Sequence, residues 1–135
     1  MKYARFLYVS AITALCLAGC SQNQLISTAQ LSTATAQKTI DQWIKSGGKA
    51  TVNGVQELPQ ENTARADLTI SNFTFQQATG FGGVRPRTYS GPGTAIFTHY
   101  NDGRWVLSQI ETNGNNEFSP ATWEHINLEV SNNTK

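Results

Sequence analysis

The chain has few of the residues that build metal or redox chemistry. Its 135 residues include only two cysteines, Cys16 and Cys20, and two histidines, His99 and His125. A zinc site needs three or four suitably spaced ligands, and the sequence has no H-x-x-x-H or H-E-x-x-H pattern. We therefore assign both histidines structural roles, and the sequence predicts neither a metal nor a cofactor.

Catalytic motifs are also missing. No serine lies in a G-x-S-x-G turn, and the glycine-rich segment 80–93 lacks the G-K-[ST] of a phosphate-binding loop. The acidic residues show no spacing suited to paired acid–base work on a glycosidic bond. We therefore predict that the protein is not an enzyme.

The chain also lacks an excess of either positive or negative charge. Charged residues make up 14% of the chain, with ten basic and nine acidic side chains. Lys2 and Arg5 precede Cys20, so the rest of the chain has eight basic and nine acidic side chains. Without a basic stripe, the sequence gives no indication of nucleic-acid binding.

Long apolar runs are absent too. Residues 6–18 are mostly apolar, but they fall short of the roughly 20 residues that span a bilayer. The run follows Lys2 and Arg5 and ends in small residues. A basic start, an apolar stretch and a small-residue end predict an export signal rather than a membrane-spanning helix.

The end of this run carries a more specific motif. Leu17-Ala18-Gly19-Cys20 resembles the lipobox of bacterial lipoproteins, and the resemblance covers the first 20 or so residues. It implies a signal peptide over residues 1–19, cleavage before Cys20 and acyl chains (palmitate among them) on that cysteine. Because Cys16 would leave with the signal, no disulfide could form. Ser21 in place of aspartate resembles the pattern sorted to the outer membrane of Gram-negative bacteria.

The remaining chain predicts a polar tether over residues 20–34 and one α+β domain over residues 35–135. Ala36, Ile40, Trp43 and Ile44 share one face of a helix over residues 35–46. Thr33 or Thr35 is expected to cap its start, and Gly47-Gly48 to end it.

Strands are predicted after the helix. The first, over residues 49–58, has an irregularity at Asn53-Gly54. In the second, residues 64–76, the apolar alternation changes phase near Ser71-Asn72, which predicts a bulge. A hairpin over residues 93–112 turns at Asn101-Asp102-Gly103. A helical turn from Ser119-Pro120 and an edge strand over residues 126–130 complete the chain.

This order predicts one N-terminal helix packed on a curved antiparallel sheet of four to five strands. It resembles the layout of cystatin-like and nuclear-transport-factor-2-like domains. The resemblance concerns element order alone and implies no activity.

Both faces of the predicted 93–112 hairpin are apolar. The bulkier face, which we expect the helix to cover, carries Ala95, Phe97, His99, Trp105 and Leu107. The other carries Ile96, Tyr100, Val106 and Ile110. We expect this second face to be covered by the segment with Phe118 and Trp123, by a partner or by a ligand.

One segment is a candidate binding element. Residues 80–93 are predicted to form a long loop between two strands, and long loops often bind ligands. Arg85 and Arg87 could hold a carboxylate or phosphate, with Phe81 and Tyr89 supplying contact area. The alternative is a flexible loop that two arginines keep soluble.

Together these features predict a membrane-anchored envelope lipoprotein acting as a non-enzymatic binding or assembly module. Cys20 would hold it in the membrane, and an envelope protein or a second copy would bind through the sheet face. One alternative is a small-ligand carrier or enzyme with a cavity between helix and sheet, which a deep pocket containing His99 and a polar partner would favour. Another is a structural subunit of a lipoprotein assembly.

Overall fold

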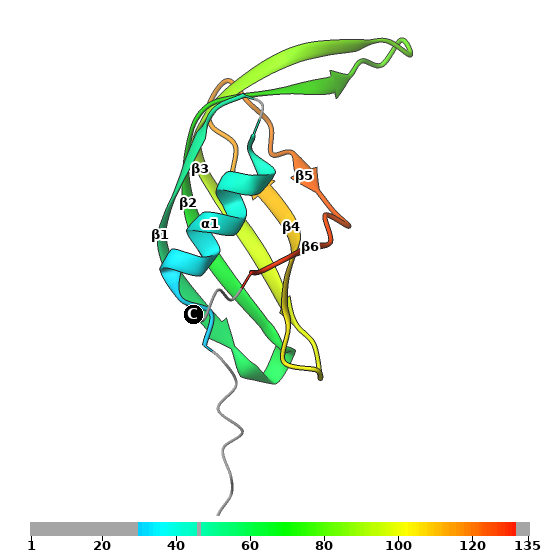
Figure 1. Ribbon diagram of the computed structural model, residues 1–135. Helices are drawn as coiled ribbons and strands as arrows, with labels where there is room; N and C mark the ends of the chain where they lie inside the picture. Colours follow the sequence, from blue (N-terminus) through cyan, green and yellow to red (C-terminus); the bar gives the residue numbers. More distant parts are fainter. Residues whose placement is uncertain (1–29, 46, 132–135) are drawn as a thin grey trace, which may run out of the picture.

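The protein consists of one helix packed on a curled antiparallel sheet (Figure 1). The structure is a computed structural model that describes residues 30–45 and 47–131, so Cys20 and the predicted signal peptide lie outside it. Helix α1 (Thr33–Trp43) comes first. The strands are β1 (Lys49–Leu58), β2 (Thr63–Ala78), β3 (Val84–His99), β4 (Trp105–Thr112), β5 (Thr122–Trp123) and β6 (Leu128–Glu129), with a 3₁₀ turn, η1 (Pro59–Glu61), between β1 and β2.

The α+β class is confirmed. The sheet runs in the order β1-β2-β3-β4-β5, and β6 pairs with β4, which makes six strands in the described part rather than four or five. The two short strands, β5 and β6, both pair with β4, and β5 is the one that was not predicted.

Helix α1 buries the predicted face. Ala36, Ile40 and Ile44 are all buried in the main core. The predicted N-cap, Thr33 or Thr35, is wrong, because the Oγ of Ser32 accepts the hydrogen bond from the Thr35 amide at 3.1 Å. Leu31 is also buried, and its amide donates to Glu57 Oε1 at 2.7 Å. Packing therefore extends into the segment predicted to be tether.

The connection from α1 to β1 crosses close to β2. A Cβ on Gly48 would lie 2.6 Å from the Cα of Phe73, and Gly48 has a φ of +135°. Beside it, the Thr74 amide donates to the Gly47 carbonyl at 2.8 Å. Only glycine combines this φ with such a close approach, so Gly48 fixes where the chain enters the sheet. The predicted helix end is wrong, because α1 ends at Trp43 with Ile44 as its C-cap and covers Thr33–Trp43 rather than residues 35–46.

Both irregularities predicted in the first two strands are confirmed. The β1–β2 register shifts between Val52 and Gly54, and the β2–β3 register shifts between Ile70 and Phe73. Within the second bulge, Asn72 has a φ of 52°, a left-handed conformation that asparagine tolerates. The bulge turns Phe73 and Phe75 onto the core side of the sheet.

The β3–β4 hairpin has the predicted turn. The Tyr100 amide donates to the Arg104 carbonyl at 2.9 Å, and Phe97 pairs with Leu107. Phe97 and Leu107 are fully buried in the core cluster that contains the α1 residues. The helix therefore covers the bulkier face, as predicted.

The predicted second face is wrong at Ile110. Ser108 is an extra residue in β4, because Ile96 pairs with Gln109 while Phe97 pairs with Leu107. This bulge reverses the alternation, so Ile110 enters the core and is fully buried. Tyr100, at 43%, is the most exposed of the four residues assigned to that face.

The C-terminal segment runs along β4 in extended form. The predicted helical turn at Ser119-Pro120 is wrong, because β5 forms there instead and pairs with Ile110 and Glu111. The Thr112 amide donates to the Ala121 carbonyl at 2.9 Å, so pairing with β4 outweighs the local helix signal. The predicted edge strand is present in β6, although shorter than expected.

Candidate binding site on the hairpin arm

A two-stranded arm projects beyond the rest of the sheet (Figure 1). Pairing of β1 with β2 ends at Ser71, and pairing of β4 with β3 begins at Gly93. Residues 72–92 therefore pair only with each other along most of their length, and we call them the hairpin arm. The predicted long loop is wrong, since β3 already begins at Val84 and the turn is closed by a 2.7 Å hydrogen bond from the Thr79 amide to the Gly83 carbonyl.

Prolines do not prevent β3 from forming because they face its free edge. The Pro92 carbonyl accepts from the Asn113 amide at 3.0 Å, on the side away from β2. A residue's nitrogen and carbonyl share one edge of a strand, so the Pro92 nitrogen also faces away from β2. Strand alternation places Pro86 on that edge too. No ladder hydrogen bond is lost at either residue.

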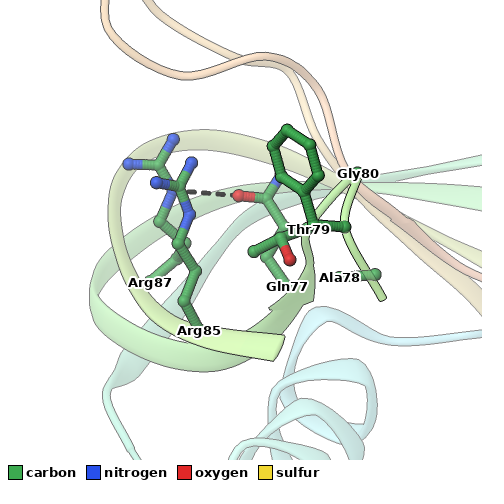
Figure 2. A pocket seen from close by; sticks show the side chains of 7 residues that line it. Gln77, Ala78, Thr79, Gly80, Arg85 and Arg87 are labelled. Atoms are coloured by element: carbon green, nitrogen blue, oxygen red, sulfur yellow. Dashed lines mark hydrogen bonds between the residues drawn. The ribbon is translucent and has the colours of Figure 1, made fainter. Parts of the chain in front are cut away.

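A shallow hollow lies on the inner face of the arm near its tip (Figure 2). Its volume is about 510 Å³. Three of the predicted binding residues line it, Phe81 from the turn and Arg85 and Arg87 from β3. Arg87 is held in place, because its Nε donates to Gln77 Oε1 at 2.9 Å. The remaining lining residues are Gln77, Ala78, Thr79 and Gly80.

The tip of the arm is unusually apolar for an exposed turn. Phe81 is fully exposed and Val84 is 70% exposed. Large apolar side chains that project singly from a surface are common, but here two lie within four residues on an element that projects from the domain. Phe81 and Val84 are the two most exposed large apolar side chains in the described part of the chain.

The charged side chains of the arm are all arginines. Between Asp67 and Asp102 the sequence contains Arg85 and Arg87 and no acidic residue. The ion pairs found within residues 30–45 and 47–131 both involve Arg104, far from the arm in sequence. The two arginines therefore face the hollow without a carboxylate partner, which suits it to an anionic group.

Tyr89 does not join the other predicted binding residues. It is 1% exposed, its ring centroid lies 4.9 Å from that of Phe118, and burial raises the pKa of its phenol above the usual value. Tyr89 therefore holds the base of the arm and cannot offer contact area to a ligand.

The base of the arm rests on an aromatic cluster that sequence reasoning missed. Trp43 from α1 packs in a tilted arrangement on Phe73 and edge-on to Trp123, at centroid distances of 5.0 and 5.6 Å. Phe75 lies 5.6 Å from Phe118. Phe118 and Trp123 thus pack on the helix side of the sheet rather than over its second face. The Arg87 guanidinium carbon is 5.8 Å from the Phe118 ring centroid, which links the cluster to the hollow.

His99 lines a second, smaller pocket. This pocket, of about 150 Å³, also contains Glu57 and Trp105. It is smaller than the roughly 300–1,000 Å³ of typical small-molecule sites. The His99 ring lies 4.6 Å from that of Trp105, and its Nε2 is buried without a hydrogen-bond partner in the described residues. His125 lines a different hollow, and no three acidic, histidine or cysteine side chains of the described chain group as metal ligands.

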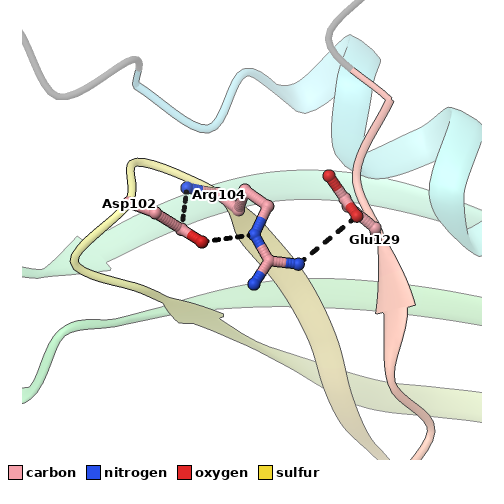
Figure 3. Close-up of polar contacts among 3 residues, drawn as sticks. All are labelled: Asp102, Arg104 and Glu129. Carbon is pink, nitrogen blue, oxygen red and sulfur yellow. Dashed lines mark hydrogen bonds and ion pairs between the residues drawn. The ribbon is translucent and has the colours of Figure 1, made fainter.

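The charged residues of the β3–β4 turn bind one another (Figure 3). Arg104 Nε lies 2.6 Å from Asp102 Oδ2, and its Nη1 lies 3.4 Å from Glu129 Oε2. The hydrogen bond from Arg104 lowers the pKa of Asp102, and the same bond raises the pKa of Arg104. These contacts connect the β3–β4 turn to β6. The three charged groups are paired with one another rather than directed at a ligand.

Comparisons with protein-family models, with curated proteins and with solved structures find no significant match to this chain. The functional assignment therefore depends on the arm and on the sequence itself. No helix within residues 30–45 and 47–131 has the length and apolar character needed to cross a membrane.

Proposed function

We propose that the protein is a lipid-anchored, non-enzymatic component of the bacterial cell envelope that binds another envelope component through its hairpin arm. The anchor is the acylated Cys20, in a motif followed by Ser21, which favours the outer membrane. The observation that carries the binding role is the arm itself, where Phe81, Arg85 and Arg87 surround one hollow.

The position of the arm supports this role. The chain enters the domain at Leu31, whose amide is bonded to Glu57 near the end of β1. The arm leaves from the opposite end, where Lys49 pairs with Ser71. The 16 residues of β2 follow a path of roughly 50 Å at about 3.3 Å per residue. An anchored chain would therefore hold the arm well away from its attachment point.

The anchor is tested by metabolic labelling with an alkyne analogue of palmitate. We expect the Cys20→Ser variant to lose the label and to accumulate as precursor or as a soluble form. Cys16→Ser is the matched control and should label like the wild type. Equal labelling of Cys20→Ser and wild type would contradict the lipoprotein assignment.

The binding role is tested by photo-crosslinking in intact cells. A benzophenone amino acid at position 81 should form adducts with another envelope component. The same residue at position 51, which is exposed on β1 away from the arm, serves as the control. Adducts from position 81 alone support the arm as the binding element, whereas identical products from both positions count against it.

A further inference from the structure

We infer that the tip of the hairpin arm docks on an anionic phospholipid surface, as a membrane contact separate from the acyl anchor. The inference rests on the proposed function, because it names the partner of the same arm. Two apolar side chains at the tip would enter the interface, and two arginines behind them would hold lipid phosphates.

The tip has the composition of an interfacial insertion element. Residues 79–84 carry no charge, and both Phe81 and Val84 are largely exposed. Phe81 lines the hollow, whereas Val84 does not, so apolar surface lies on more than one side of the tip. A protein partner that bound the hollow would bury apolar side chains on one side of the tip only. A bilayer into which the tip inserts would bury the side chains on all of its sides. Aromatic side chains are also favoured at the membrane interface.

The arginines lie at a depth suited to headgroups. Arg85 and Arg87 follow Val84 by one and three residues, which corresponds to about 3 and 10 Å along the strand. The polar layer of each leaflet is roughly 5–8 Å thick, so the two guanidinium groups would lie within or just above it when Val84 reaches the acyl boundary. Guanidinium groups bind phosphate through paired hydrogen bonds. No acidic residue in the arm opposes this contact.

An acidic polypeptide is the competing partner, and the arm fits it less well. The usual way to bind an extended chain is to add it as a strand to an open edge. On the free edge of β3, Pro86 and Pro92 each remove one of the backbone donors that such a strand would use, which disfavours pairing there. Val84 does not line the hollow, so a peptide bound there would leave Val84 uncovered.

The experiment uses the full lipidated protein held in nanodiscs of phosphatidylcholine. These are mixed with vesicles of phosphatidylcholine alone or of phosphatidylcholine with phosphatidylglycerol, and co-flotation is measured. We expect flotation with the anionic vesicles only. Because each arginine near an anionic surface contributes about fivefold in affinity, Arg85→Gln combined with Arg87→Gln should weaken binding on the order of 30-fold. Phe81→Ser should also weaken it, and Arg65→Gln, an exposed control on β2 outside the arm, should not.

Each other outcome overturns the inference. Unchanged flotation of the double arginine variant would show that the arm is not the contact. Full competition by inorganic phosphate, with no effect of Phe81→Ser, would indicate an anion site alone. Capture on polyglutamate without flotation would indicate an acidic protein partner. If the double variant loses its cooperative melting, Arg85→Gln alone gives the same test, since Arg85 is exposed. Palmitate labelling is measured in parallel, so failure of the anchor is distinguished from failure of the docking contact.

Discussion

The phenol of Tyr89 donates a hydrogen bond to the carbonyl oxygen of Pro92, and the two oxygens are 2.6 Å apart. This hydrogen bond links two residues of β3 at the point where the arm joins the rest of the sheet. Gly91 lies between the two residues, and a Cβ there would come within 2.6 Å of the Tyr89 hydroxyl. The Pro92 carbonyl also accepts from Asn113, so one oxygen connects the arm to the segment after β4.

We expect Tyr89→Phe to lower the free energy of unfolding by about 1 kcal/mol, the usual contribution of one hydrogen bond. The Pro92 carbonyl keeps its bond from Asn113, so no larger loss is expected. Thermal unfolding followed by circular dichroism provides the measurement. Tyr100→Phe, on a partly exposed ring, is the matched control and should leave the midpoint unchanged. Equal midpoints for all three proteins would contradict a structural role for the hydroxyl.

The same phenol predicts sensitivity to alkaline pH. Burial raises the folded-state pKa of Tyr89 above the ordinary value of 10.0, so the neutral form is favoured in the folded protein. Its contribution to stability is therefore complete below the unfolded-state pKa and is lost as pH rises through the folded-state pKa. Urea unfolding across this range should show a steeper loss for wild type than for Tyr89→Phe. Parallel pH profiles would contradict this assignment.

Ile110→Ala is expected to destabilise the domain by about 2–4 kcal/mol, because it opens a cavity beside fully buried neighbours. Ile96 lies on the other face and is only half-buried, so Ile96→Ala is the matched control and should cost clearly less. Chemical denaturation of the two variants distinguishes the faces. Equal losses would contradict the Ser108 bulge.

Gly48→Ala should cost on the order of 1–3 kcal/mol, the usual range for a strained backbone conformation. The reason is the positive φ of Gly48 together with its contact to the Phe73 backbone. Gly54 has open space around its Cβ position and serves as the control. A Gly48→Ala variant as stable as Gly54→Ala would show that the α1–β1 connection can shift without loss.

Much of the fold could be predicted because the signals were local. Gly103 fixes the β3–β4 turn, and the change of phase around Asn72 marks the bulge in β2. The sequence around Ser108 contains no such signal, because a bulge residue that is neither glycine nor asparagine cannot be distinguished from any other strand residue. Its effect on Ile110 appears only once Phe97 and Leu107 are paired.

The candidate site was predicted in part for the same reason. Residue type alone marks Phe81, Arg85 and Arg87, and it does not depend on register. The burial of Tyr89 follows from its pairing with Phe73 across the arm, and a segment expected to be a loop offers no such partner. Glycine and proline, which usually mark loops, here lie in a strand with one free edge.

The continuity of β2 and β3 has a mechanical consequence. The same two strands form the arm and the middle of the sheet, so a pull on the tip acts directly on the core. The antiparallel hydrogen bonds lie perpendicular to the strands. A force between the tip and the anchor would act parallel to the strands. Many bonds between β1 and β2 would then be loaded in shear at once instead of opening one by one. A tethered protein built in this way resists extension along its length far better than peeling from its edge.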